Sequence, residues 1–355
     1  MIACPVKQVE DTLLVMPAFS LITATEQFLL LHHEQKVKVK IFASTEAAFV
    51  NTLFTTTASA PFLEEFAAAG ASHEGHFHTE EEVFENAGLA YIPPAQREGM
   101  GEVAKAKSIR TWPTLIETTD IKGIIHSHST WSDGQYDLET MATAAAQEGF
   151  EYLVISDHSR TAVYANGLSI ERIQAQHAQI DELNRRLAPF RIFKSIESDI
   201  LGDGSLDYPE DILSTFDLVI ASVHANLKMT EEKAMQRLLK AIENPHTTIL
   251  GHMTGRLLLS RNGYPVDHDK IIDACVANNV VIELNAHPRR LDMDWRYIAK
   301  ALDKGCLISI DPDAHSIEGF ADIRYGVLAA QKGGLTKQHN LSSFSAVELD
   351  AYLHK

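Results

Sequence analysis

From residue 121 onward, short apolar runs rich in β-branched residues alternate with longer segments whose apolar residues recur at helical spacing. Runs of this length between helical segments are typical of buried strands. Strands that alternate with helices predict a parallel sheet joined by crossover helices. The expected strands cover residues 121–128, 152–158, 193–199, 218–224, 248–252, 280–287 and 307–315. The expected helices cover residues 138–149, 170–187, 230–244, 270–279, 295–305 and the segment after 319.

Seven strand–helix units predict an α/β fold in which the sheet closes into a barrel, one unit short of the usual eight. The first 120 residues lack this alternation. Residues 36–44 have the pattern of a strand, and residues 45–54 and 60–70 have the pattern of helices. We therefore expect three parts, which are a small α+β domain (1–70), a connector (71–120) and the barrel (121–355).

The connector is acidic and rich in turn residues, and the spacing Thr-x-x-Glu predicts that its one helix begins at Thr79. It also carries His73, His76 and His78. Three histidines this close together are able to bind a metal ion. Because nothing around them predicts a fixed geometry, we expect a solvated loop instead.

The charge balance argues against a general attraction to nucleic acid. The chain has 31 Lys and Arg against 48 Asp and Glu, a net charge of -17, and neither the first 120 residues nor the rest is basic. Nucleic-acid contact would therefore depend on a local patch or on metal ions that reverse the local sign.

Three cysteines, at positions 4, 275 and 306, fit neither a disulfide framework nor a zinc knuckle, so we expect reduced thiols. Residues 13–25 are apolar, but acidic residues precede them and Pro17 interrupts them. A signal sequence has a basic start, and a membrane span is longer. We expect a soluble, cytoplasmic protein that does not contact the membrane.

Nearly every expected strand ends on a residue that binds metals well. In a barrel these strand ends converge on one mouth, where active sites are built. A histidine after one strand is usually only a hydrogen-bonded loop residue, but a repeat at the same structural position is not expected by chance. The residues at or just after the strand ends are His126, His128, His158, Glu197, His224, His252, Asn285, Asp313 and His315.

The spacing of these residues supports shared ions. Positions i and i+2 of a strand face the same side, so His126 and His128 are able to reach one ion, as are Asp313 and His315. Glu197 and Asp199 repeat this spacing, and Asp199 is equally compatible with a supporting role. Imidazole and carboxylate ligands suit Zn²⁺, Mn²⁺ or Fe²⁺. So many candidate ligands imply two or three divalent ions.

The succession HSH…D, DH, E, H, GH and DAH, each after a strand, resembles the PHP (polymerase and histidinol phosphatase) family. The resemblance implies a distorted seven-stranded, TIM-like barrel and a trinuclear metal centre. It also implies a grouping of nine ligands. The first ion would be bound by His126, His128, Glu197 and Asp313. The second would be bound by Glu197, His224 and His252. The third would be bound by Asp133, His158 and His315.

A narrower resemblance covers residues 71–355. LDYPEDIL, ASVHANL, ILGHMTGRLL and ELNAHPRRLDMDW are similar to the C-terminal PHP domain of bacterial family X DNA polymerases. Residues 36–70 are less closely similar to the end of a polymerase palm and the start of its thumb. The helix-hairpin-helix region, most of the palm and a recognisable acidic triplet are absent. The resemblance therefore implies a degenerate polymerase remnant, with loss of polymerisation, before a hydrolytic domain.

Such a centre predicts hydrolysis of a phosphate ester by a metal-activated hydroxide, with Glu197, His128 and Asp313 as its catalytic core. Arg160, Arg256 and Arg290 are candidates to bind the phosphate, although each is equally compatible with an ordinary salt bridge. Asp157, Asp199 and Asn285 are candidates to orient the ligands.

Three functions are compatible with these residues. The resemblance favours a phosphodiesterase that acts as a 3′–5′ exonuclease on single-stranded DNA or DNA 3′ ends, as in DNA repair. A phosphomonoesterase for a small molecule, of the histidinol-phosphatase kind, is the alternative. A non-catalytic metal-binding scaffold is disfavoured by the complete ligand set. No residue pattern predicts an oligomeric state.

Overall fold

A computed structural model describes residues 5–34 and 36–354, and the chain divides into two compact units between Pro113 and Thr114. Cys4 lies outside the described residues. Cys275 and Cys306 are buried free thiols, and burial raises the pKa of Cys306 to about 12. Both thiols therefore stay protonated at neutral pH.

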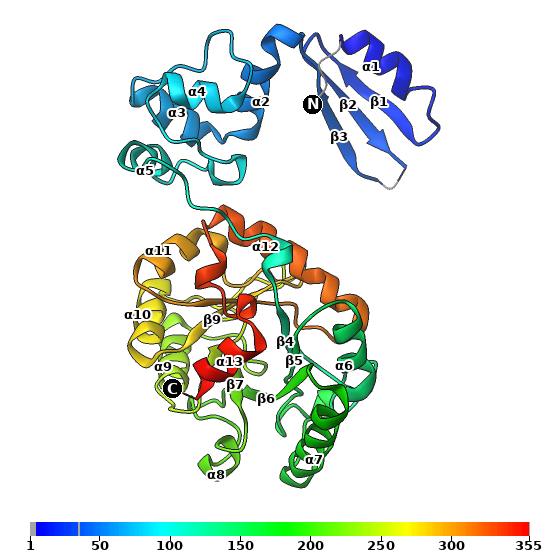
Figure 1. Cartoon of the computed structure of the whole chain (residues 1–355), viewed down its shortest axis with the longest axis vertical. Coiled ribbons are helices and arrows are strands. Elements are labelled where there is room, and N and C mark those ends of the chain that lie inside the picture. Colours follow the sequence, from blue (N-terminus) through cyan, green and yellow to red (C-terminus); the bar gives the residue numbers. More distant parts are fainter. Residues whose placement is uncertain (1–4, 35, 355) are drawn as a thin grey trace. The chain divides into compact units, whose positions relative to one another are not determined.

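The first unit begins with a small antiparallel sheet of order β1-β2-β3, flanked by one helix (Figure 1). The elements are α1 (Val6–Leu13), β1 (Phe19–Ala24), β2 (Phe28–His33) and β3 (Lys38–Phe42). Val9, Leu29 and Leu31 form its small core. The expected strand at 36–44 is confirmed as β3. Residues 13–25 contribute the end of α1, a turn and β1.

The rest of the first unit is helical and has a core of its own, dominated by Phe54, Phe62, Phe66 and Phe84. Its elements are η1 (Glu46–Ala48), α2 (Phe49–Thr57), α3 (Ala60–Ala68), α4 (Glu80–Asn86), η2 (Pro94–Gln96) and α5 (Glu102–Ser108). As expected, α4 begins after Thr79, whose hydroxyl accepts the Glu82 amide.

Residues that we expected to form only a connector also enter this core, because Val83, Phe84, Ile92 and Val103 bury their side chains there. The boundary expected at residue 70 therefore falls inside one packed unit. His73 packs against Phe54 with ring centroids 5.5 Å apart. Among the described residues, the three connector histidines belong to no metal-binding cluster.

The second unit is the expected barrel. Seven parallel strands lie in the order β10-β9-β8-β7-β6-β5-β4. They are β4 (Gly123–Ser127), β5 (Tyr152–Ile155), β6 (Arg191–Asp199), β7 (Leu218–Ser222), β8 (Ile249–Leu250), β9 (Val281–Asn285) and β10 (Ile308–Asp311). The edges β4 and β10 approach through Ala314, whose carbonyl accepts the His128 amide at 2.8 Å and whose amide donates to the His126 carbonyl at 3.1 Å. The sheet is thereby nearly closed.

Helices surround the sheet (Figure 1). The main ones are α6 (Leu138–Gln147), α7 (Ile170–Leu187), α8 (Glu210–Leu213), α9 (Glu231–Ile242), α10 (His268–Asn278), α11 (Ile298–Asp303), α12 (Ile323–Lys332) and α13 (Ala346–Leu353). Short 3-10 turns are η3 (Thr118–Asp120), η4 (Val163–Ala165), η5 (Trp295–Tyr297), η6 (Ile317–Asp322), η7 (Lys337–His339) and η8 (Leu341–Ser343).

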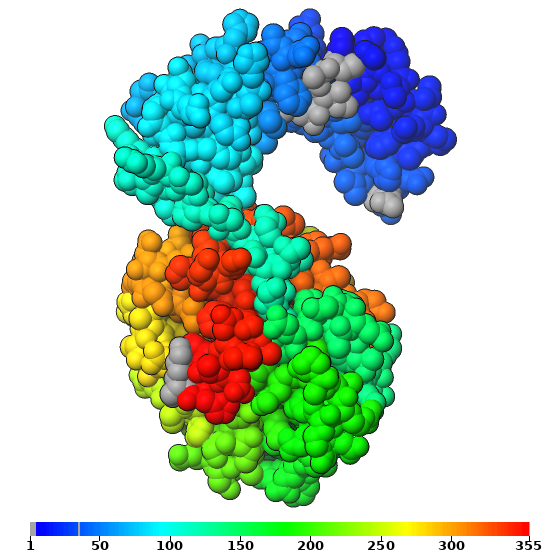
Figure 2. Space-filling view, in the orientation of Figure 1, coloured from blue at the N-terminus to red at the C-terminus, as the bar shows by residue number. Residues whose placement is uncertain are grey.

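Alternate strand residues pack on opposite sides of the sheet. Leu153 and Ile155 of β5 join the core beneath the helices, whereas Tyr152 and Val154 join a separate cluster with residues from β4, β6, β7, β8 and β9. Side chains from so many strands meet only in the interior of a barrel. Leu349 of α13 belongs to this inner cluster. In Figure 2 the red C-terminal segment lies between the green and the yellow-orange surfaces.

Candidate metal centre

The carboxyl ends of the seven strands bring all nine expected ligands to one place. His126 lies in β4, His128 directly follows it, Glu197 lies near the end of β6, and the others lie in the loops that follow the strands. The loop members are Asp133, His158, His224, His252, Asp313 and His315. Parallel strands dictate this result, because their carboxyl ends all lie on the same face of the barrel.

The carboxylate of Glu197 lies at the middle of the cluster. Its Oε1 is 3.0 Å from Nε2 of both His224 and His252 and 3.3 Å from Nε2 of His126. Its Oε2 is 3.0 Å from Nδ1 of His158 and 3.7 Å from Nε2 of His128. One carboxylate therefore contacts five imidazoles, an arrangement suited to bridging two cations.

Eight of the nine side chains form three groups whose ligand atoms lie within 4.8 Å of one another. The groups are His126, His128 and Asp313; His158, Glu197 and His224; and His128, Asp133, His158 and His315. His128 and His158 therefore each belong to two groups, where the expected grouping gave them one. His252 belongs to none of the three groups but contacts Glu197.

Several ligand atoms are buried without a hydrogen bond. They include Nε2 of His126, both ring nitrogens of His128 and Oε2 of Glu197. Polar atoms without hydrogen bonds are costly inside a protein, and so many at one point are explained when cations occupy the space between them. The imidazole and carboxylate donors fit divalent metal ions.

The electrostatics differ between the candidate ligands. Burial, reinforced by His315 and His158, lowers the pKa of His128 to about 3, so that its ring is neutral and able to coordinate. Burial opposes the charge of Glu197, but His224, His126 and His158 hold the pKa of its carboxyl well below the ordinary value. Against the effect of burial, the neighbouring carboxylates raise the pKa of His126 well above the ordinary value and that of His224 to about 10. A metal ion bound by these two rings would therefore displace a proton from each.

Two ligand positions have unusual backbone conformations. The φ angles of His126 and Asp313 are 61° and 53°, in the left-handed region that side chains disfavour. Both residues lie where the Ala314 backbone joins β4 to β10. Residues other than glycine that adopt the left-handed conformation are concentrated at functional sites, where the surrounding structure stabilises the strained backbone.

The supporting acids lie behind the ligands. Asp199 contacts Nδ1 of His224 and accepts the Thr161 hydroxyl at 2.7 Å. Asn285 donates to Asp313 at 3.2 Å. Asp157 acts differently, because it accepts the amides of residues 129 and 132 and so fixes the loop between His128 and Asp133.

Glu283 also belongs to the site, although its sequence context did not mark it as a candidate. This buried carboxylate in β9 contacts Nδ1 of His126, accepts the His252 amide at 2.5 Å and accepts from Asn285 at 3.3 Å. A carboxylate behind a histidine fixes its tautomer and orientation. The sequence feature that could have identified Glu283 is its position two residues before Asn285. This spacing places both side chains on the same face of the strand.

The three candidate arginines have different surroundings. Arg290 is mostly buried and lies 3.3 Å from Asp313, so it borders the cluster directly. All three guanidinium nitrogens of Arg256 donate hydrogen bonds within the protein. Their acceptors are the carbonyls of residues 290 and 291 and the carboxylate of Asp294. Arg160 is half exposed and pairs with Asp207 at 3.2 Å.

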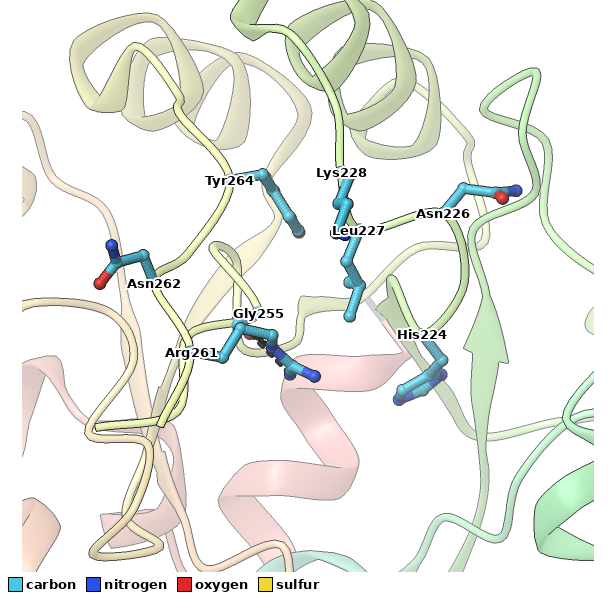
Figure 3. Close-up of a pocket in the computed structure, with 8 residues that line it drawn as sticks. All are labelled: His224, Asn226, Leu227, Lys228, Gly255, Arg261, Asn262 and Tyr264. Carbon is cyan, nitrogen blue, oxygen red and sulfur yellow. Dashed lines mark hydrogen bonds between the residues drawn. The ribbon is translucent and has the colours of Figure 1, made fainter. Parts of the chain in front are cut away.

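Two hollows adjoin the cluster. One, of about 650 Å³, is lined by His224, Asn226, Leu227, Lys228, Gly255, Arg261, Asn262 and Tyr264 (Figure 3). The other, of about 420 Å³, is lined by His287, Asp313, Ala314, His315, Ser316, Glu318, Gly319 and Asp322. The centre is therefore accessible to a ligand on both sides.

In the described part of the chain, none of the helices combines the length and the apolar character needed to cross a membrane.

No protein-family model matches the chain. DNA polymerase/3′-5′ exonuclease PolX of Bacillus subtilis is 42% identical over 280 residues, which are 79% of this chain and 48% of that protein. The chain thus spans about half the length of this relative. A probable phosphatase of Clostridium acetobutylicum is 31% identical over 202 residues, which are 54% of this chain and 78% of that protein.

Among solved structures, histidinol phosphate phosphatase of Lactococcus lactis, complexed with zinc, L-histidinol and phosphate, matches with a TM-score of 0.45 and 18% identity. The match covers 60% of this chain and 94% of that chain. The identity and coverage of the sequence relatives, together with the seven-stranded barrel and its ligand-bearing strand ends, establish the family. The chain belongs to the PHP (polymerase and histidinol phosphatase) family of metal-dependent phosphoesterases.

Proposed function

We propose that this protein hydrolyses phosphodiesters as a 3′–5′ exonuclease on DNA ends, without polymerase activity. The observation that carries the proposal is the Glu197 carboxylate in contact with five histidines, next to Asp133 and Asp313. The 42% identity to a DNA polymerase/3′-5′ exonuclease supports DNA as the substrate. In this proposal the first 70 residues are a degenerate polymerase remnant. The enzyme would act in DNA repair in the cytoplasm.

We assign two or three divalent ions to the centre, with Mn²⁺, Zn²⁺ and Fe²⁺ as the candidates. The nine side chains would hold them, and Glu197 would be shared between two of the ions. Bound here, such ions supply Lewis acidity toward the phosphoryl oxygens and generate a hydroxide nucleophile from water at neutral pH.

The chain's own residues prepare the site for a phosphate. Glu197, His128 and Asp313 fix the centre at which the ester reacts. Arg290 brings a permanent positive charge to the same place, and the carboxylate of Asp313 at 3.3 Å orients it. Its guanidinium is placed to neutralise a phosphate oxygen. Arg256 already has protein acceptors, so Arg290 is the stronger candidate for this role.

A phosphomonoesterase is the second candidate. It is favoured by the relative that is named a probable phosphatase, of which the chain covers 78%. The acidic surface, with a net charge of -17, also favours a small substrate over a polymer. A metal-binding scaffold without activity is the least favoured function, because it would not require the full ligand set.

Three substrates distinguish these functions. The purified protein is loaded with Mn²⁺ and assayed on p-nitrophenyl phosphate, bis(p-nitrophenyl) phosphate and a 3′-labelled oligonucleotide. We expect cleavage of the diester and release of labelled nucleotide from the 3′ end. Cleavage of the monoester alone would overturn the exonuclease proposal, and metal binding without any turnover would support the scaffold. Elemental analysis should find two or three ions per chain, and one ion or none would contradict the multinuclear centre.

A further inference from the structure

The larger hollow adjoins the metal centre directly, since His224 forms part of its wall. In Figure 3, Leu227 and Lys228 lie on one side, Arg261 lies across from them, and Tyr264 points into the space between. A volume of about 650 Å³ lies in the range of pockets that hold small organic ligands. A phosphate group alone would leave most of it empty.

The charge of this hollow is opposite to that of the protein. Lys228 and Arg261 contribute two cations, and no carboxylate is among the residues that line it, although the net charge of the chain is -17. The carbonyl of Gly255 accepts Nε and one terminal nitrogen of Arg261 at 3.0 and 2.8 Å, which fixes the guanidinium at this wall. Such a lining favours a ligand with a negative charge of its own.

The remaining lining is suited to a flat organic group. Leu227 provides apolar surface, with a small contribution from Tyr264, which is only 6% exposed. Its hydroxyl is buried and has no hydrogen-bond partner in the described part of the chain. Gly255, with φ at 62°, has no side chain to crowd Tyr264, because a Cβ there would lie 3.1 Å from the ring.

The smaller hollow, on the side of Asp313 and His315, has the opposite character. It is lined by the carboxylates of Glu318 and Asp322, together with the imidazole of His287. A chain of phosphates is repelled on this side and attracted on the Lys228 side. At the 3′ end of DNA, the terminal nucleoside carries no further phosphate, whereas the nucleotide before it does.

We propose that the pocket of Lys228, Arg261, Leu227 and Tyr264 binds the nucleotide on the 5′ side of the scissile phosphate. This inference rests on the proposed exonuclease function. The base packs against Leu227 beside Tyr264, and the nucleotide's own 5′ phosphate pairs with Lys228 and Arg261. Water adds to phosphorus as the bond to the 3′ oxygen breaks. This nucleotide therefore leaves with a 3′ hydroxyl, and the terminal nucleotide leaves with a 5′ phosphate.

Two dinucleotides that differ only in one phosphate test the pocket. The Mn²⁺-loaded protein is assayed on pdTpdT and dTpdT. We expect kcat/KM to be about tenfold higher for pdTpdT, mainly through a lower KM, because a charge-assisted pair with the 5′ phosphate is gained. Lys228→Ala and Arg261→Gln should each bring this ratio toward one, and Lys228→Glu should bring it below one. Lys233→Ala, an exposed lysine of α9 outside the pocket, should leave the ratio as in the wild type.

The outcomes separate this inference from the function on which it rests. Equal cleavage of both dinucleotides by the wild type, or a ratio unchanged by Lys228→Ala, overturns the pocket assignment and leaves the phosphodiesterase in place. Hydrolysis of p-nitrophenyl phosphate with no cleavage of either dinucleotide overturns both. Thermal unfolding of each variant confirms that the fold is intact. Lys228 is exposed, so its replacement is not expected to disturb the fold.

Discussion

Glu283 and His126 form a buried pair in which the carboxylate contacts Nδ1 of the imidazole while Nε2 faces Glu197 at 3.3 Å. The same carboxylate accepts the His252 amide. Glu283 thus fixes two of the proposed ligands without being one itself. Burial opposes a charge on His126, but Glu283, Asp313 and Glu197 raise the pKa of its imidazole well above the ordinary value.

Glu283→Gln should weaken metal binding about 10- to 100-fold, because the neutral amide no longer fixes the tautomer and basicity of His126. Competition between the protein and a fluorescent chelator measures the affinity. Glu243→Gln, at the exposed end of α9, makes the same chemical change away from the centre and should have no effect. Equal affinities of the Glu283 variant and the wild type would show that the pair does not support a ligand.

His128→Ala should abolish hydrolysis of every substrate that the wild type cleaves. The side chain belongs to two of the three ligand groups, so its loss disturbs both. Activity should fall by at least 1,000-fold, on the order of an essential electrostatic group or more. The paired measurement is the metal content by elemental analysis, which should fall by at least one ion per chain. A variant with normal activity would mean that the site is assigned to the wrong residues.

Arg97→Met should destabilise the first unit by about 3–5 kcal/mol, the usual cost of removing one partner of a buried ion pair. Arg97 is fully buried, contacts Glu80 at 2.5 Å and lies over the rings of Phe54, Phe84 and Tyr91. Its loss leaves the Glu80 charge without compensation. Hydrogen exchange of the α2–α5 amides during urea unfolding measures the effect.

The double substitution Arg97→Met/Glu80→Leu serves as the control for this prediction. It removes both charges together, so it should recover most of the lost stability. If the double variant is as unstable as Arg97→Met, packing of the guanidinium against the aromatic rings matters more than its charge.

His177 should make stability depend on pH. Burial, followed by Lys194, lowers the pKa of this α7 imidazole to about 4, and its ring packs edge-on against Phe216. The unfolded chain binds this proton below about pH 6.5, and the folded chain only below about 4. The contribution of His177 is therefore complete above pH 6.5 and is lost as the pH falls toward 4.

Urea unfolding at pH 7.5 and pH 5.0 measures this dependence. The wild type should lose more stability between the two values than His177→Gln does, because the variant lacks the titrating group. The difference between the two proteins isolates His177 from the other histidines. Equal losses would mean that the ring is already protonated, or is accessible to water, in the folded protein.

The seven strands of the barrel could be predicted from the sequence because each contains apolar residues between helical segments, and all of their residues except Arg191 and Lys194 are buried. The helices between them could be predicted from their 3.6-residue spacing. In the first unit the prediction was less complete. β1 and β2 were not recognised, because apolar residues there follow one another without alternating, and only β3 has the alternating Lys-Val-Lys-Ile pattern.

The local sequence also determined which side chains reach the mouth of the barrel. A side chain that directly follows a parallel strand must lie at the carboxyl end of that strand. Which ligands are neighbours was decided by the tertiary structure. The left-handed backbone of His126 and Asp313 lies where β4 closes on β10, next to the contact of His128 with Asp133. His158 lies against Glu197 because the two are bridge partners at the ends of β5 and β6. These distances depend on the register between neighbouring strands, and the residue pattern of a single strand does not specify that register.

The role of a charged residue depended most on the fold. In the sequence, Glu283 is one acid in an apolar strand, and Arg256 follows a candidate ligand just as Arg290 does. In the structure, Glu283 contacts and orients His126. Arg256 donates hydrogen bonds to backbone carbonyls, whereas Arg290 lies next to Asp313 at the centre. The sequence by itself determined the barrel, which follows from local periodicity, and the set of candidate ligands, which follows from the strand-end positions and the family resemblance. Only the tertiary structure decided their partners, because hydrogen bonds and ion pairs join residues that are distant along the chain.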